Sequence, residues 1–196
     1  MSIEASADAE LIQDFANTRD RRAFVPRGHP HRDGSKDDIA TPAALRDWLT
    51  EHDLLSEGVD VTDRDHDRVL RLRTALREAL GDNRQPGDNR QPGDYARARP
   101  FAMSLRVELD PDDGPRLGTT EPGVDQAIGQ LCAAALRISL TGEWHRLRAC
   151  AADDCQWIFF DQSRPGRGRY CSPYSCGNRV KTRAYRQRKT GAPPRR

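Results

Sequence analysis

Four of the five cysteines of this chain lie close together, in two pairs of equal spacing. Each pair has the form C-x4-C, and a spacer of fifteen residues separates the pairs, which gives the set Cys150, Cys155, Cys171 and Cys176. Four thiolates converging from two short loops suit one zinc ion in a tetrahedral site. A segment this short buries little core by itself, so the metal would supply much of its folding free energy.

The other use of paired cysteines is in disulfides or redox chemistry. The acidic N-terminus, MSIEASADAELIQDF, has no signal-peptide pattern, which favours a cytoplasmic protein whose thiols stay reduced. Clustered cysteines in that compartment favour a structural metal.

The fifth cysteine, Cys132, is surrounded in sequence by apolar residues and is expected to be a small buried side chain rather than a reactive thiol. No apolar run reaches the length of a membrane span, so no membrane partner is expected.

Charge divides the chain at the same place as the cysteines. Residues 148–196 carry a formal charge of +9, whereas residues 1–147 carry −7. An acidic body joined to a basic tail indicates a polyanionic partner for the tail. Only three of the 32 basic residues are lysine, a bias that fits a GC-rich bacterial genome. We therefore predict two domains, 1–147 and 148–196.

Apolar periodicity predicts an α+β fold, in which the N-terminal domain is mainly helical and contains a small β-hairpin. Helices are expected at 8–20, 42–52, 62–80 and 122–141. Thr41 and Thr62 are candidate N-caps. Alternating residues in 101–109, with a return strand in 115–120, predict the hairpin. The tandem repeat GDNRQP within 81–94 predicts a flexible surface loop.

The cysteine segment is predicted to fold as a treble-clef-like zinc finger. The spacer WIFFDQSRPGRGRY combines an apolar run with a turn-prone RPGRG, which indicates a hairpin whose return strand brings Cys171 to the site. Ser172 and Pro173 then favour the start of a basic helix that extends to about residue 189. Cys176 would project from the first turns of this helix.

The basic helix is expected to have two faces. Cys176, Val180 and Ala184 recur every four residues and should pack toward the metal, whereas Arg179, Arg183 and Arg186 share a different face. A nucleic-acid backbone would relieve the repulsion among these like charges. The alternative is a solvated basic tail that binds nothing.

The run Cys176-Gly177-Asn178-Arg179, preceded by C-x4-C and the WIFFD…SR…RYC spacer, resembles the CGNR-type zinc finger. In that family the finger follows an ABATE domain, which is described as a stress-induced transcription regulator. The segments DFANTRD (14–20) and ALRDWLTEHDLL (44–55) are similar to the first two helices of that domain. The resemblance implies one zinc ion held by the four cysteines and contact between the finger and DNA.

Several residues follow as candidates for nucleic-acid contact: Arg164, Arg167, Arg169, Asn178, Arg179, Lys181, Arg183, Arg186, Arg188 and Lys189. Asn178 could read a base edge or satisfy backbone groups of the metal site. Arg179 is expected to face a phosphate or a guanine. Gly177 is expected to leave room for the metal site or for the DNA backbone.

The leading hypothesis is a zinc-dependent transcription regulator whose N-terminal domain senses a ligand or mediates assembly. Its candidate partners are DNA, a small-molecule effector and a second copy of the chain. Polar residues that follow the apolar part of the first helix could line an effector pocket or form a solvated helix end: Asn17, Arg19, Arg21 and Arg22. The alternative is an RNA-binding or protein-interaction module. An enzyme is disfavoured because a four-cysteine site leaves no position for water and no catalytic motif is present.

Overall fold

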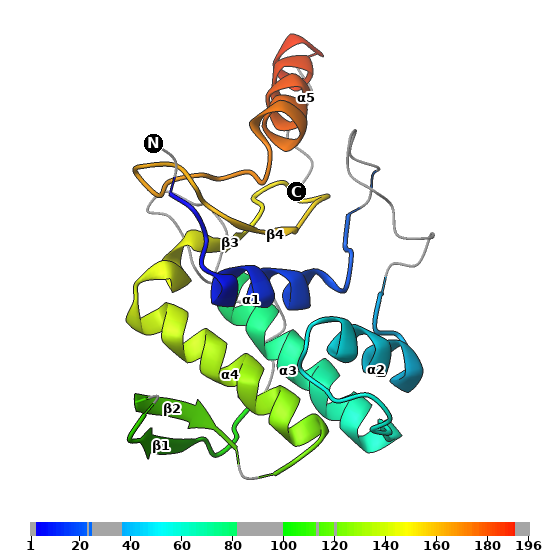
Figure 1. Cartoon of the computed structure of the whole chain (residues 1–196). Coiled ribbons are helices and arrows are strands. Elements are labelled where there is room, and N and C mark those ends of the chain that lie inside the picture. Colours follow the sequence, from blue (N-terminus) through cyan, green and yellow to red (C-terminus); the bar gives the residue numbers. More distant parts are fainter. Residues whose placement is uncertain are drawn as a thin grey trace.

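A computed structural model of the chain describes residues 3–22, 24, 37–81, 100–112, 114–119 and 121–190 (Figure 1). Residues 82–94 of the predicted repeat loop lie outside these ranges. Within them, helices alternate with two small antiparallel hairpins, which confirms the α+β prediction. No helix among these residues is both long enough and apolar enough to cross a membrane.

Four helices form the body of the molecule: α1 (Ala7–Asn17), α2 (Pro42–Glu51), α3 (Asp63–Gly81) and α4 (Val124–Leu140). Three of them begin at a hydroxyl side chain that accepts a backbone N–H, as the sequence predicts for two of them. Ser6 accepts from Ala9, Thr41 from Ala44, and the Thr62 hydroxyl from Asp65. Such caps satisfy N–H groups that have no partner inside the helix.

The core lies where α1, α3 and α4 meet. Each helix contributes a stripe of apolar side chains at helical spacing, among them Ile12, Val69, Ile128 and Leu131, which are all fully buried. Burying one such side chain contributes about 1.5–3 kcal/mol. Cys132 packs at the edge of this core, and burial raises the pKa of its thiol to about 11, as suits an inert side chain.

Helix α1 ends earlier than the predicted residue 20. Beyond Asn17 the backbone turns and pairs with a distant segment, because Arg19 forms an isolated bridge with Asp37 and Asp38 N–H donates to Thr18 O at 2.7 Å. Arg73 of α3 fixes this turn by donating to the Thr18 hydroxyl and to both carboxylate oxygens of Asp37. These long-range contacts stop the helix where local propensity would let it continue.

The predicted hairpin forms as β1 (Arg106–Asp110) and β2 (Gly114–Gly118), joined by a turn in which Gly114 has a φ of +77°. Strand β2 lies between α4 and β1, so that β1 is the outer strand (Figure 1). The prediction placed the strand start at residue 101. Phe101 and Met103 instead pack against the core from irregular backbone.

The hairpin of the finger differs from the prediction. A short 3-10 turn (Glu143–Arg146) leads into β3 (Leu147–Ala149), and β3 pairs with β4 (Ile158–Phe160) rather than β4 pairing with the residues before Cys171. One face of this hairpin, formed by Leu147, Ile158 and Phe160, is buried in the main core. This burial selects β3 as the partner of β4, and it also joins the start of the finger to the helical body.

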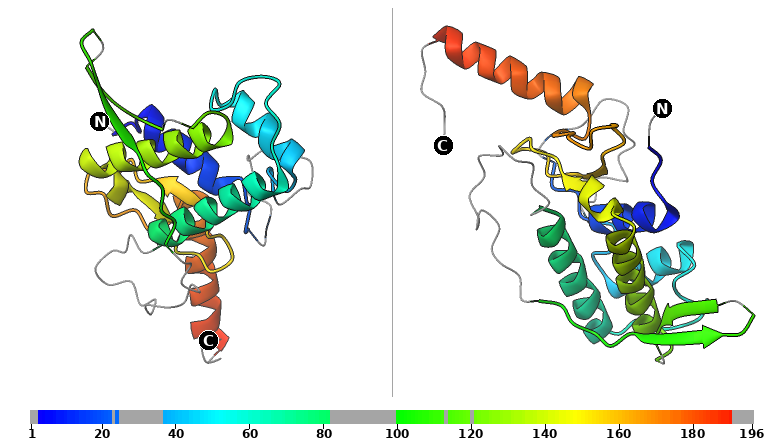
Figure 2. Two further views of the ribbon diagram at one scale, coloured as in Figure 1. Left: turned by 90° about the horizontal axis from the view of Figure 1, so that it is seen from below. Right: turned by 90° about the vertical axis from the view of Figure 1, so that its left-hand side faces the viewer.

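The last element that the structure describes is a helix that projects from the body. A π-helical turn (Pro173–Gly177) begins at Ser172, whose hydroxyl accepts the N–H of Ser175, and leads into α5 (Asn178–Thr190). The predicted helix start is thus confirmed. The two views of Figure 2 show α5 standing away from the four body helices.

Candidate metal centre and nucleic-acid interface

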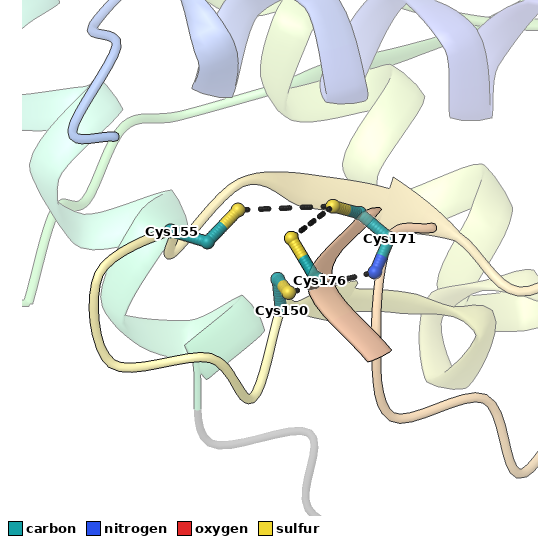
Figure 3. Close-up of side chains that lie close together, drawn as sticks. All are labelled: Cys150, Cys155, Cys171 and Cys176. Carbon is teal, nitrogen blue, oxygen red and sulfur yellow. Dashed lines mark hydrogen bonds between the residues drawn. The ribbon is translucent and has the colours of Figure 1, made fainter. Parts of the chain in front are cut away.

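The four cysteines predicted to bind metal meet at one point (Figure 3). Their Sγ atoms all lie within 4.8 Å of one another, with 3.7 Å between Cys155 and Cys171 and 3.6 Å between Cys171 and Cys176. A zinc ion with Zn–S bonds of about 2.3 Å has tetrahedral S–S edges of about 3.8 Å. The two separations that involve Cys171 Sγ are close to that edge, and both are far longer than the ~2.05 Å bond of a disulfide.

Backbone hydrogen bonds hold the two cysteine loops in this arrangement. Cys150 N–H donates to Trp157 O at 2.8 Å and Cys155 N–H donates to Ala152 O at 2.9 Å, which closes the first loop. Ala151 N–H donates to Arg169 O at 2.8 Å, and Cys171 N–H points at Cys150 Sγ at 3.5 Å. The second loop is therefore fastened to the first immediately before Cys171.

The crowding of the thiols favours a bound cation. Hydrogen bonds with Cys155 and Cys171 lower the pKa of Cys150 to about 2. The hydrogen bond with Cys150 is the main cause that raises the pKa of Cys155 to about 12. Four thiolates in one small volume repel one another, and a bound divalent cation removes that conflict. The four thiols can bind one zinc ion as a complete tetrahedral set of ligands, and such a set leaves no open position for water.

Asp161, in the spacer between the cysteine pairs, organises the loop that follows β4. Its carboxylate is buried and accepts the N–H of Ser163 at 3.0 Å and of Gly168 at 2.6 Å. Burial by itself raises the pKa of Asp161, but these hydrogen bonds outweigh it and the pKa is lowered. A Cβ at Gly168 would lie 2.7 Å from the carboxylate, so a side chain there would disrupt the loop.

Arg179 of the CGNR run is partly buried beside the metal site. Its Nη2 donates to the Asp154 carboxylate at 2.7 Å and lies 3.9 Å from Cys176 Sγ, while its guanidinium stacks 3.2 Å above the Phe24 ring. Its Nε and Nη1 atoms are buried. Arg183 binds the other oxygen of Asp154 at 3.2 Å. Both arginines share a helix face, as predicted, but that face turns toward Asp154.

The two other residues of the run lie differently. The Asn178 side chain is exposed and makes no hydrogen bond within the described part of the chain, so it does not support the metal loop. A Cβ at Gly177 would lie 3.5 Å from the Tyr170 ring, which is an ordinary contact distance. Crowding inside the finger, which the sequence suggested, therefore does not explain this glycine.

The other candidate nucleic-acid residues are exposed. On α5 these are Lys181, Arg186, Arg188 and Lys189, and on the loop between the cysteine pairs they are Arg164, Arg167 and Arg169. Lys181, Arg188 and Lys189 form no ion pair with any residue that the structure describes. Helix α5 carries six cationic residues and no acidic one, so it presents a strongly positive surface.

The residues predicted to line an effector pocket are not gathered around one cavity. Asn17 is buried, and its side-chain amide donates to Ile158 O at 2.7 Å and accepts the Ile158 N–H at 2.9 Å, so it fastens β4 to α1. Arg19 and Arg21 are exposed. Arg22 is buried, binds Asp20 at 2.7 Å and lies 4.0 Å above the Trp157 ring.

A hollow of about 570 Å³ lies between α1 and the finger. Arg22 is the one predicted effector residue that borders it, and three of the metal cysteines form part of its wall. Other lining residues combine polar and aromatic side chains, namely Glu10, Gln13, Trp157, Phe159 and Tyr170. The hollow therefore borders both the first helix and the metal centre.

Sequence reasoning missed two residues that complete the site. Asp154 anchors both Arg179 and Arg183 across 25 and 29 positions of sequence. An acidic residue inside an otherwise basic segment was the available signal. Arg77 of α3 donates to Ala16 O and to Gln156 O, which ties the first cysteine loop to the body. No local pattern marks that arginine, because its partners are backbone carbonyls.

The fold and the site define a class of protein, a helical domain that carries a four-cysteine zinc finger with a basic helix. Comparison with protein families agrees. Residues 146–189 match the CGNR zinc finger, and residues 9–153 match the ABATE family, described as "Putative stress-induced transcription regulator". The second match covers most of the chain, which therefore belongs to the ABATE family. No curated protein matches the chain.

Proposed function

We propose that this protein is a zinc-dependent DNA-binding transcription regulator of the bacterial cytoplasm, active in a stress response. The observation that carries the proposal is α5, a helix with six cations and no acid that stands out from the body immediately after the last metal ligand. A helix of this kind suits the major groove, where its cations bind phosphates and release counterions. Zinc would fix the helix in its place.

The position of Asn178 adds a means of sequence reading. Its amide is exposed at the first residue of α5 and is not used inside the finger. An exposed asparagine can form a bidentate pair with adenine in the major groove. We infer that Asn178 reads a base, that Lys181, Arg188 and Lys189 bind phosphates, and that Arg179 supports the metal site.

The N-terminal domain would sense a small-molecule effector. The hollow between α1 and the finger supports this, because a ligand that filled it would contact Gln13 of α1 and Tyr170 next to the metal site at once. Gln13 also accepts the Phe160 N–H at 2.8 Å, so a ligand there would act on the contact between the body and the finger. The aromatic lining favours a planar or apolar ligand with polar groups at its edge.

RNA is the second candidate partner, because phosphate contacts do not distinguish it from DNA. Tyr174 and Tyr185 are exposed by 87% and 60%, which would allow stacking on unpaired bases. Fluorescence anisotropy of the zinc-loaded chain on duplex DNA and on single-stranded RNA, with and without a chelator, tests both. Tighter binding to the duplex that disappears with the chelator supports the proposal. Tighter binding to RNA, or binding that survives metal removal, contradicts it.

A further inference from the structure

We propose that β1 is the dimerisation strand of this protein, and that it pairs antiparallel with β1 of a second copy about Val107. The hairpin is separate from α5, so this dimer does not depend on what α5 binds. Two apolar side chains of β1 are exposed. Val107 is 62% exposed and Leu109 is 79% exposed, although they alternate along a strand as core residues do.

The outer edge of β1 is open to another strand. Strand β1 pairs with β2 on one side, and no other strand among the described residues pairs with it. Its free edge presents unpaired N–H and C=O groups, which are a template for a further strand. No proline, lysine or bulge interrupts residues 104–110 to prevent such pairing. A two-stranded hairpin is also only marginally stable, and pairing with the two strands of a second copy would stabilise it.

The sequence of the strand is complementary to itself. When Val107 lies opposite Val107 of the second copy, Leu105 of each copy lies opposite Leu109 of the other copy on the apolar face. On the other face, Arg106 of each copy lies opposite Glu108 of the other copy. Apolar and opposite-charge pairs of this kind stabilise antiparallel strands. Pairing about Glu108 instead would place two glutamates against each other, so the structure favours the register about Val107.

The apolar face of the hairpin is continuous with a hollow in the body. Val107 lies opposite Leu117 in the hairpin, and Leu109 lies opposite Pro115, so all four share one face. Val107, Leu117 and Pro115 border a hollow of about 700 Å³. The rest of its lining combines two apolar residues with polar and charged ones, namely Leu11, Leu54, Asp53, Arg116, Gln130 and Arg137. A second copy seated at β1 would extend this apolar face across the two-fold axis. Two chains would then present two α5 helices, as DNA sites with two halves require.

Charge exchange within β1 tests the register. Arg106→Glu or Glu108→Arg places like charges opposite each other, which should raise the dimer dissociation constant by about tenfold or more. The double variant R106E/E108R restores opposite charges in the register about Val107 and should dimerise again. Sedimentation equilibrium over a wide concentration series gives the constants, and circular dichroism confirms that each variant is folded.

A matched apolar pair provides the control. Leu109→Lys should weaken the dimer, whereas Leu140→Lys, at a position of similar exposure (77%) at the end of α4, should not. Hydrogen exchange of the natural chain should show protection of residues 104–110 that grows with concentration. A natural chain that stays monomeric throughout would overturn the proposal. So would equal weakening by both lysine variants, or a double charge variant that remains monomeric.

Discussion

The cations of α5 do not contribute equally to the positive surface, and this difference gives a quantitative prediction. Lys181 and Arg188 are seven residues apart, are exposed, and have no ion-pair partner in the described structure. Arg179 is bound to Asp154 and stacked on Phe24. Replacing both Lys181 and Arg188 with alanine should therefore remove two phosphate contacts, whereas replacing Arg179 should remove none directly.

The magnitude follows from counterion release. Each phosphate contact contributes about −0.9 to the slope of log K against log salt, so K181A/R188A should lower the magnitude of the slope by about 1.8. Between 50 and 200 mM salt, the natural protein should lose roughly twelvefold more affinity than the double variant over the same range. Fluorescence anisotropy on one mixed-sequence duplex at several salt concentrations measures both slopes.

The control for this experiment is Arg71→Ala, which removes an exposed cation from α3 without changing the finger. It should leave the slope as it is in the natural protein. An unchanged slope in K181A/R188A would refute the assignment of α5 as the phosphate-binding element. A change of similar size in R71A would show that the slope reports overall charge rather than contact.

Three further predictions concern the support of the site. Arg179→Ala should speed zinc loss to a chelator by about 10–100-fold, because Arg179 contacts the metal ligand Cys176 without binding the metal itself. A colorimetric zinc assay measures the rate. Asn17→Ala leaves both backbone groups of Ile158 without their buried partner and should cost about 2–4 kcal/mol in urea unfolding. Asp37 makes stability depend on pH. Burial raises its pKa, but the hydrogen bond and charge of an α3 guanidinium outweigh this, so the folded pKa lies below the unfolded one. Its stabilisation is present above the unfolded pKa and is lost as the pH falls through the folded pKa, so Asp37→Asn should flatten the fall of stability with acid in thermal melts.

The sequence predicts best what depends on local spacing. The stripes of apolar residues in α3 and α4 lie on one helix face because of helical geometry alone. In α3 this stripe consists of Val69, Leu72, Leu76 and Leu80, which are all buried. The metal set was predictable for the same reason, since two loops with equal spacing bring Cys150 and Cys171 to one ion. The start of the last helix was predictable from Ser172 and Pro173.

What the sequence did not predict depends on contacts between distant segments. Strand β4 pairs with β3 because Ile158 and Leu147 are buried together in the core of the body. Arg179 turns inward because Asp154 lies on the other cysteine loop, which no helix periodicity reveals. Asn17 is the last residue of α1 and was predicted as a polar residue of an effector pocket, but its partner is the backbone of Ile158, 141 positions away.

An NMR titration of the ¹⁵N-labelled, zinc-loaded chain with a short DNA duplex shows directly whether α5 is the element that binds DNA. We expect the chemical-shift changes to concentrate in residues 178–190, with the Asn178 side-chain amide among the largest. The Arg179 Nε–H, which is buried beside the metal site, should move little. Shifts concentrated in α1–α4, with α5 unaffected by saturating duplex, would contradict the proposal that α5 binds DNA.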